Sequence, residues 1–144
     1  MNLIWGIFLT VLSLLGWLGQ VVNALAPALA QRWGLNERES DVDSTFFADT
    51  RGEAIWDALI IWTMPVAGVL LIVDSPLWAY FGLVGGGSYV YFVGRGIAVR
   101  LVMRRRGIRI GPPEAVRLYF GLFGLFGLIA VVTIVMAAAA LAPS

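Results

Sequence analysis

Acidic residues in the first half of the chain are the best placed to do chemistry. Asp41, Asp43 and Asp49 lie in one polar stretch, and carboxylate oxygens are the ligands that hard divalent cations prefer. An EF-hand loop is excluded, because Phe46 stands where the loop glycine belongs and Gly52 where the bidentate glutamate belongs. The three aspartates are therefore weak candidates for adventitious metal binding, and we expect no bound cofactor.

Three residue types that carry many reactions are missing. The sequence contains no cysteine, no histidine and no lysine, so all ten basic residues are arginine. These absences exclude a thiolate nucleophile, a serine–histidine–aspartate triad, the usual zinc ligand set and a Schiff-base cofactor. We therefore expect that the protein is not an enzyme.

Two charged residues fall inside strongly apolar stretches. Asp57 lies about one helical turn inside residues 54–73, and Arg95 lies at a similar depth inside residues 77–103. Charges within a membrane span are costly and are usually paired, so one interpretation is an ion pair between Asp57 and Arg95. The other is that Arg95 extends its side chain to the membrane interface, as long basic side chains do.

Further charges flank the apolar stretches. Residues 31–53 contain twice as many acids as arginines, whereas residues 103–117 are strongly basic. Opposite charge favours contact between these two segments, and a basic run also suits anionic lipid headgroups. The arginines that we assign to headgroups or to a partner protein are Arg104, Arg105, Arg106 and Arg109.

The composition assigns the chain to the membrane class. Of 144 residues, 60% are hydrophobic and 13% are charged, and the mean hydropathy is +0.86, whereas soluble domains average about a quarter charged. A bilayer core needs about 20 apolar residues in a helix, and four stretches meet that length. The predicted spans are residues 3–25, 54–73, 77–103 and 115–141.

These spans predict an all-α fold, a four-helix transmembrane bundle that forms one integral membrane domain over residues 1–144. The helices would run up and down in turn. The second and third would form an antiparallel hairpin, because the segment 74–76 supplies capping groups and a first-turn proline. Pro65 removes a backbone hydrogen bond within the second span and predicts a kink near residues 61–64.

The distribution of arginine predicts the orientation of the bundle. The loops 31–53 and 103–114 contain arginines, whereas the turn at 74–76 and both termini contain none. Loops rich in basic residues stay in the cytoplasm, so both termini are expected outside. The use of arginine for lysine, with abundant alanine and glycine, is typical of a GC-rich bacterial genome and indicates a bacterial cytoplasmic (inner) membrane protein.

The segment 28–30, Ala-Leu-Ala, resembles a signal-peptidase site. The stretch before it has no positively charged start and is too long for a typical signal peptide. We therefore expect the mature protein to keep residues 1–30.

Small and polar residues follow one face of the first span at spacings of three and four. In lipid, small residues let helices approach closely, and amide side chains form hydrogen bonds across the contact. The alternative is a wetted pathway lined by Ser13, Gln20 and Asn23. The residues that we assign to helix packing on this face are Gly16, Gln20 and Asn23.

Glycines mark the third and fourth spans. Gly82 and Gly86 form a G-x-x-x-G pair, which is typical of close helix packing. The consecutive glycines 85–87 also suit a broken helix that exposes carbonyl groups to an ion, as in transporters. The packing glycines that we expect in these two spans are Gly82, Gly86, Gly121, Gly124 and Gly127.

Two functions from different classes fit these features. We favour a non-enzymatic accessory or assembly subunit, held in a larger membrane complex or a homo-oligomer by its glycine-rich helices. The alternative is a small oligomeric channel or transporter for an ion or small solute, which needs polar groups that meet near the membrane midplane. The expected partners are membrane lipids and other membrane subunits or a second copy of the chain, and no nucleic acid. The polar set whose convergence would favour the alternative is Ser13, Gln20, Ser88 and Tyr89.

Overall fold

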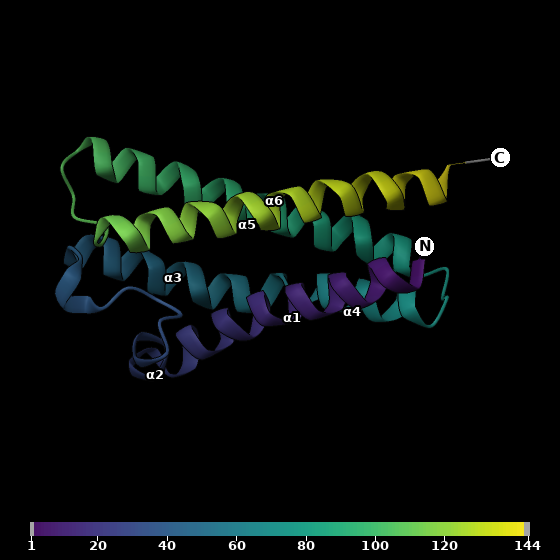
Figure 1. Ribbon diagram of the computed structural model, residues 1–144, viewed down its shortest axis with the longest axis horizontal. Coiled ribbons are helices and arrows are strands. Elements are labelled where there is room, and N and C mark those ends of the chain that lie inside the picture. Colours follow the sequence, from purple (N-terminus) through teal and green to yellow (C-terminus); the bar gives the residue numbers. More distant parts are fainter. Residues whose placement is uncertain (1, 143–144) are drawn as a thin grey trace.

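The computed structural model describes residues 2–142, and within that range the chain is helical with no strand (Figure 1). The ends at residues 2 and 142 lie at one end of the bundle, as an up-and-down order requires. The helices are α1 (Asn2–Leu25), α2 (Pro27–Arg32), a 3-10 turn (Glu39–Asp41), α3 (Ser44–Ile60), α4 (Thr63–Ile72), α5 (Trp78–Arg105) and α6 (Pro113–Leu141).

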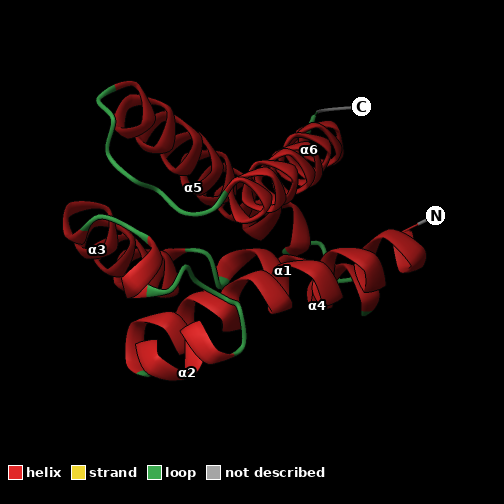
Figure 2. Cartoon of the chain, turned by 60° about the vertical axis from the view of Figure 1, so that its left-hand side comes forward, coloured by secondary structure: helices red, strands yellow, loops and turns green. Residues whose placement is uncertain are grey.

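The long helices form two layers that diverge toward one end (Figure 2). In one layer α1 packs against α3 and α4, and in the other α5 packs against α6. The layers are joined mainly where α4 packs against α5, whereas α1 and α6 make little direct contact. This arrangement leaves room between α1 and α6, where the candidate site lies.

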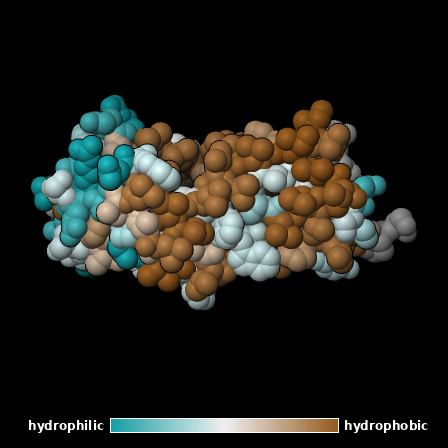
Figure 3. All heavy atoms as spheres, turned by 90° about the horizontal axis from the view of Figure 1, so that it is seen from below, coloured by the Kyte–Doolittle hydropathy of each residue, from teal (hydrophilic) through white to brown (hydrophobic). Residues whose placement is uncertain are grey.

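Three segments are long and apolar enough to cross a membrane, namely Leu3–Leu25, Ser44–Ile72 and Pro113–Leu141. The second consists of α3 and α4 together. The helix α5 matches them in length, but its glycines, tyrosines and arginines lower its hydropathy. The surface view agrees, because apolar side chains cover much of the face shown and hydrophilic ones gather at the end that holds the α2–α3 segment (Figure 3).

The break between α3 and α4 confirms the kink that Pro65 predicts. Residues 61 and 62 form a turn, and the N–H of Met64 donates to the carbonyl of Ile61 at 3.2 Å. Pro65 has no N–H with which to continue the regular ladder at that carbonyl. The break between α3 and α4 lies one turn beyond Asp57.

Helix boundaries differ from the predicted ones at the loop end. The predicted loop 31–53 is helical from Ser44 onward, because Asp43 caps α3 by accepting a 2.8 Å hydrogen bond from the N–H of Thr45. The first span ends at Leu25 as predicted, since Pro27 starts the separate helix α2. The long polar loop is therefore confined to residues 33–43, apart from one 3-10 turn.

The helix α5 runs without interruption through the three consecutive glycines. A Cβ added at Gly85 would lie 2.7 Å from the backbone of Met64, and one at Gly86 would lie 2.5 Å from Cγ1 of Ile134. These glycines are thus required by close contacts with α4 and α6. The broken-helix interpretation is wrong, and the packing interpretation is confirmed at these positions.

Two apolar clusters hold the fold together. The main core lies between the two layers and includes Leu9, Met64 and Tyr89. A smaller cluster of Val42, Phe46 and Ile110 joins the two connections at the loop end. There the N–H of Asp43 donates to the carbonyl of Arg109 at 2.8 Å. The expected contact between the acidic and basic segments therefore forms, through backbone and apolar groups.

Candidate functional site

The partners of Arg95 lie on the first half of α3. Its guanidinium is 2.7 Å from a carboxylate oxygen of Asp49 and 3.0 Å from one of Glu53. These two acids stand one turn apart on one side of α3, nearer the loop end than Asp57. The predicted Asp57–Arg95 pair is wrong, because the guanidinium of Arg95 binds Asp49 and Glu53 instead.

Asp57 is left inside the bundle without a partner. Only 1% of its surface is exposed, and neither carboxylate oxygen has a hydrogen-bond partner among the described residues. Its backbone carbonyl accepts from Ile61 just before the break in the span. An unpaired polar group in such surroundings is costly.

Arg100 is the centre of a buried network that sequence reasoning missed. It is 6% exposed, and its guanidinium lies 3.5 Å from Glu37 and 3.8 Å from Glu53. One of its N–H groups donates to the carbonyl of Gly96 at 3.2 Å. Glu37 comes from a loop far away in the sequence, and Arg100 resembles the solvated arginines that follow it, so no local pattern marks this residue.

Aromatic rings surround the same guanidinium. The centroids of Phe123, Phe46 and Tyr119 lie 4.9, 5.2 and 5.6 Å from its central carbon, within the range of cation–π attraction. Gly96 allows the ring of Phe123 to approach the guanidinium, because a Cβ at this position would lie 2.6 Å from that ring. The rings exclude water from Arg100 and so strengthen its attraction to the two glutamates.

The network holds more carboxylate oxygens than its arginines can serve. Burial raises the pKa of Glu37, although the nearby Arg100 opposes this effect. One carboxylate oxygen of Glu37 has no hydrogen-bond partner. One oxygen of Glu53 also makes no hydrogen bond, although the guanidinium of Arg95 lies 3.0 Å from it. The Nε of Arg100 is also unpartnered. The atoms of this network that make no hydrogen bond are therefore mostly carboxylate oxygens, which are acceptors.

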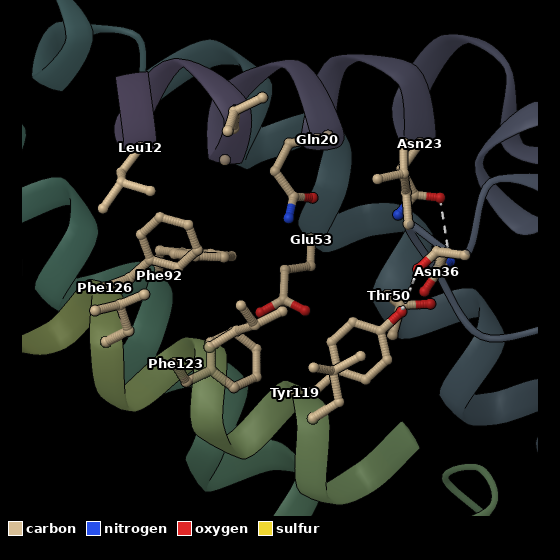
Figure 4. A pocket seen from close by; sticks show the side chains of 18 of the residues that line it. Leu12, Gln20, Asn23, Asn36, Thr50, Glu53, Phe92, Tyr119, Phe123 and Phe126 are labelled. Carbon is tan, nitrogen blue, oxygen red and sulfur yellow. Dashed lines mark hydrogen bonds between the residues drawn. The ribbon is translucent and has the colours of Figure 1, made fainter. Parts of the chain in front are cut away.

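A cleft of about 290 Å³ lies above this network, between α1 and α6 (Figure 4). One part of its wall is apolar, with Leu12, Leu15 and Phe126, and the other part is polar. In Figure 4 the side chains of Gln20 and Glu53 point into the polar part. The remaining polar lining residues are Asn23, Asn36, Thr50, Arg100 and Tyr119.

The predicted packing face of α1 makes a close helix contact at Gly16, whereas Asn23 and Gln20 take other roles. A Cβ at Gly16 would lie 3.2 Å from the hydroxyl of Tyr89, so this glycine admits a close approach. Asn23 accepts a 3.1 Å hydrogen bond from Asn36, which belongs to the loop. Gln20 lines the cleft and does not bond across a helix contact.

The predicted packing glycines of α5 and α6 divide into two groups. Gly82, Gly86 and Gly127 admit close neighbours, the nearest atoms being Cβ of Ala137, Cγ1 of Ile134 and Cγ1 of Val93. An added Cβ at Gly121 or Gly124 would meet nothing within 4 Å. Packing within the chain is therefore a wrong prediction for these two, because a spacing of three turns them away from the face that contacts α5.

The weak metal candidates do not form a site. Asp41 is exposed, Asp43 caps α3, and Asp49 binds Arg95. Across residues 2–142 no three acidic, cysteine or histidine side chains are grouped so as to hold a metal ion. Arg104, Arg105 and Arg106 are exposed at the loop end, where they are free to meet headgroups or a partner. Arg109 is exposed too, and it donates to the carbonyl of Val42 at 3.4 Å.

The polar set that would favour a channel does not converge. The hydroxyl of Tyr89 donates to the backbone carbonyl of Ser13 at 2.7 Å, inside the core. Ser88 bonds to its own helix at the carbonyl of Val84, on an exposed face, and Gln20 lines the cleft. These groups therefore line no common path.

Comparisons of this chain with protein-family models, with curated proteins and with solved structures found no match.

Proposed function

We propose that this chain is a four-span bacterial inner-membrane protein, and that it works as a non-enzymatic accessory or assembly subunit of a larger membrane complex or a homo-oligomer. The observation that carries the proposal is the outward face of α5.

The helix α5 is suited to be the fourth span in length. Its 28 residues extend about 42 Å at 1.5 Å per residue, which exceeds a hydrocarbon core of about 30 Å. It is packed between α4 and α6, which are parts of two apolar candidate spans. The sides of α5 that face α4 and α6 need little hydropathy of their own, because protein covers them.

The outward face of α5 is poorly suited to lipid. Its exposed residues recur at spacings of four and three, which places them on one stripe. An added Cβ at Gly87 or Gly94 would meet nothing within 4 Å, so the stripe contains shallow grooves in which another helix can pack closely. The residues of this α5 stripe are Tyr80, Val84, Gly87, Tyr91, Gly94 and Ala98.

The charges support an accessory role over transport. Arg95 and Arg100 are bound to carboxylates near the loop end of the bundle, and the polar set expected of a channel does not meet. A transporter places its polar groups together near the midplane. The channel or transporter function therefore has no specific support from these contacts.

A single introduced cysteine tests the proposal, because the chain has no other thiol. Gly94→Cys is labelled with a benzophenone maleimide in native membranes and irradiated, with Val131→Cys on the exposed side of α6 as the matched control. We expect a crosslinked protein from position 94 and none from position 131. Mass spectrometry then shows whether the partner is foreign, as for an accessory subunit, or a second copy of the 15.6 kDa chain. Equal labelling of lipid alone at both positions would contradict the proposal.

A further inference from the structure

We propose that the cleft between α1 and α6 binds a single-chain amphiphile with a primary ammonium head. Its head would lie against Glu53 and its chain along the leucines of α1 and α6. This site does not depend on whether the chain has partner subunits, because the α5 stripe is no part of its lining.

The position of the cleft determines how a ligand enters. Its two rims are α1 and α6, which are both apolar candidate spans and make little direct contact with each other. A gap between two spans opens sideways to the hydrocarbon of the bilayer. A molecule that reaches the polar part from there must carry an apolar chain.

The apolar part limits the size of that chain. Its wall includes Leu12, Leu15, Leu122 and Leu125. The volume of about 290 Å³ is at the low end of small-molecule pockets, which range from about 300 to 1,000 Å³. One alkyl chain suits this space better than a lipid with two chains.

The charge of the polar part determines the head. One carboxylate, Glu53, and one guanidinium, Arg100, line the cleft itself. Glu37, Asp49 and Arg95 lie behind them in the same ion-pair network, which therefore holds three carboxylates and two guanidinium groups. In such a low-dielectric place an added cation is attracted and an added anion is repelled. A sulfate or phosphate head is therefore disfavoured.

The unpartnered atoms indicate a head that donates hydrogen bonds. Glu53 is only 7% exposed and points into the cleft in Figure 4. One of its carboxylate oxygens makes no hydrogen bond, although it lies 3.0 Å from the guanidinium of Arg95. Gln20, on α1, adds an amide group that also points into the cleft. A primary ammonium supplies three N–H donors, whereas a quaternary ammonium supplies none. The structure thus matches both the charge and the donors of a primary amine.

The test is photolabelling in liposomes with a diazirine analogue of dodecylamine. Unlabelled dodecylamine, dodecyltrimethylammonium, dodecanol and dodecyl sulfate serve as competitors. We expect the label on α1 and α6 residues of the cleft, and competition by dodecylamine at a concentration at least about tenfold below the others, which corresponds to about 1.4 kcal/mol. Equal competition by dodecanol or dodecyl sulfate, or a label spread over the outer faces, would overturn the proposal.

Two matched glycine variants separate binding from folding. An added Cβ meets nothing within 4 Å at Gly19 or at Gly124, but only Gly19 lines the cleft. We expect Gly19→Leu to fill the cleft and reduce labelling on the order of tenfold, while Gly124→Leu labels as the unchanged protein does. Glu53→Gln should remove the preference for dodecylamine over dodecanol. Retained labelling in Gly19→Leu, or retained preference in a folded Glu53→Gln protein, would refute the assignment.

Discussion

Arg100 and Asp57 are buried to a similar degree but in opposite circumstances. The guanidinium of Arg100 has two glutamates and three aromatic rings around it. The carboxyl of Asp57 has no hydrogen-bond partner among the described residues. A buried charge whose partners are removed costs several kcal/mol, whereas replacing an unpaired group removes a cost. Neutralising Arg100 should therefore lower the free energy of unfolding, whereas neutralising Asp57 should raise it.

Arg100→Gln is expected to lower the free energy of unfolding by about 3 kcal/mol or more, because it leaves Glu37 buried without a cation and leaves Glu53 with Arg95 alone. Unfolding titration in mixed micelles measures the change. Arg105→Gln is the control, since Arg105 is exposed and its loss should be nearly neutral. Similar stability of the two variants would show that the buried network is not what holds the loop end together.

Asp57→Asn is expected to raise the free energy of unfolding by about 1 kcal/mol, because the amide can donate as well as accept and carries no charge. The same titration measures it, with Asp49→Asn as the matched control. Asp49 binds Arg95, so its neutralisation should lower stability. A loss of stability in Asp57→Asn would mean that its carboxylate has a favourable role in the folded protein.

Among the elements, α5 shows how glycines serve different purposes on different sides of one helix. Gly85 and Gly86 bring α4 and α6 close, whereas Gly87 and Gly94 face outward with open space beside them. The helix is also the least apolar of the long ones, so its enclosure by α4 and α6 stabilises its place in the bundle. The inner glycines are needed for this enclosure and the outer ones are not.

Gly85→Ala should lower stability by about 2 kcal/mol, because its Cβ would lie 2.7 Å from the backbone of Met64 and α4 would have to shift. Thermal unfolding followed by circular dichroism in detergent gives the change. Gly124→Ala is matched in chemistry but open, and better helix propensity should make it neutral or slightly stabilising. The prediction fails if both alanine variants melt at the same temperature.

The start of α3 should confer a pH dependence. The N–H of Thr45 bonds to Asp43 and holds the pKa of that carboxyl below its usual range. Because the pKa is lower in the folded state, the contribution is complete above the unfolded value of 3.8 and is lost as the pH falls through the folded value. The melting temperatures of the unchanged protein and of Asp43→Asn, which keeps a capping group, should run parallel above that pH, and the difference between them should change only in the acidic window. If the two proteins kept parallel pH profiles throughout, Asp43 would not be the source of the pH dependence.

At the scale of the whole molecule, the arrangement in two layers keeps the proposed binding cleft apart from the proposed partner surface on α5. Contacts between α4 and α5 hold the layers together, so α1 and α6 are free to border a cleft and α5 is free to present its outer stripe. The loop end carries the hydrophilic surface, and the apolar band covers the rest of the face in Figure 3. This polarity along the long axis is what a membrane-spanning protein requires.

The proposed orientation predicts which thiols a membrane-impermeant maleimide reaches in intact spheroplasts. Ser75→Cys, in the turn between α4 and α5, should be labelled at once, because that turn is expected outside. Arg105→Cys, at the end of α5, should be labelled only after permeabilisation. Gel shift of the labelled protein gives the result, and the reverse pattern would place the loop end outside.

Much of the helical fold follows from local features of the sequence. Hydrophobic length predicts the helices, Pro65 predicts the break between α3 and α4, and glycine spacing predicts the contacts of Gly82 and Gly86, because each of these depends on the residue and its near neighbours. The start of α3 lies before the predicted start of the second span at residue 54. Hydropathy marks only the apolar part of a helix, and a cap such as Asp43 lets the helix begin earlier, in polar sequence.

Only the tertiary structure decided which charges meet. Asp57 and Arg95 have matching depths in the sequence, yet depth says nothing about the direction in which a long side chain extends, and Arg95 reaches Asp49 and Glu53. Arg100 meets Glu37 because two distant connections pack on one apolar cluster. The cleft likewise exists because the layers of the bundle diverge, which depends on all the helix contacts together and on no single segment.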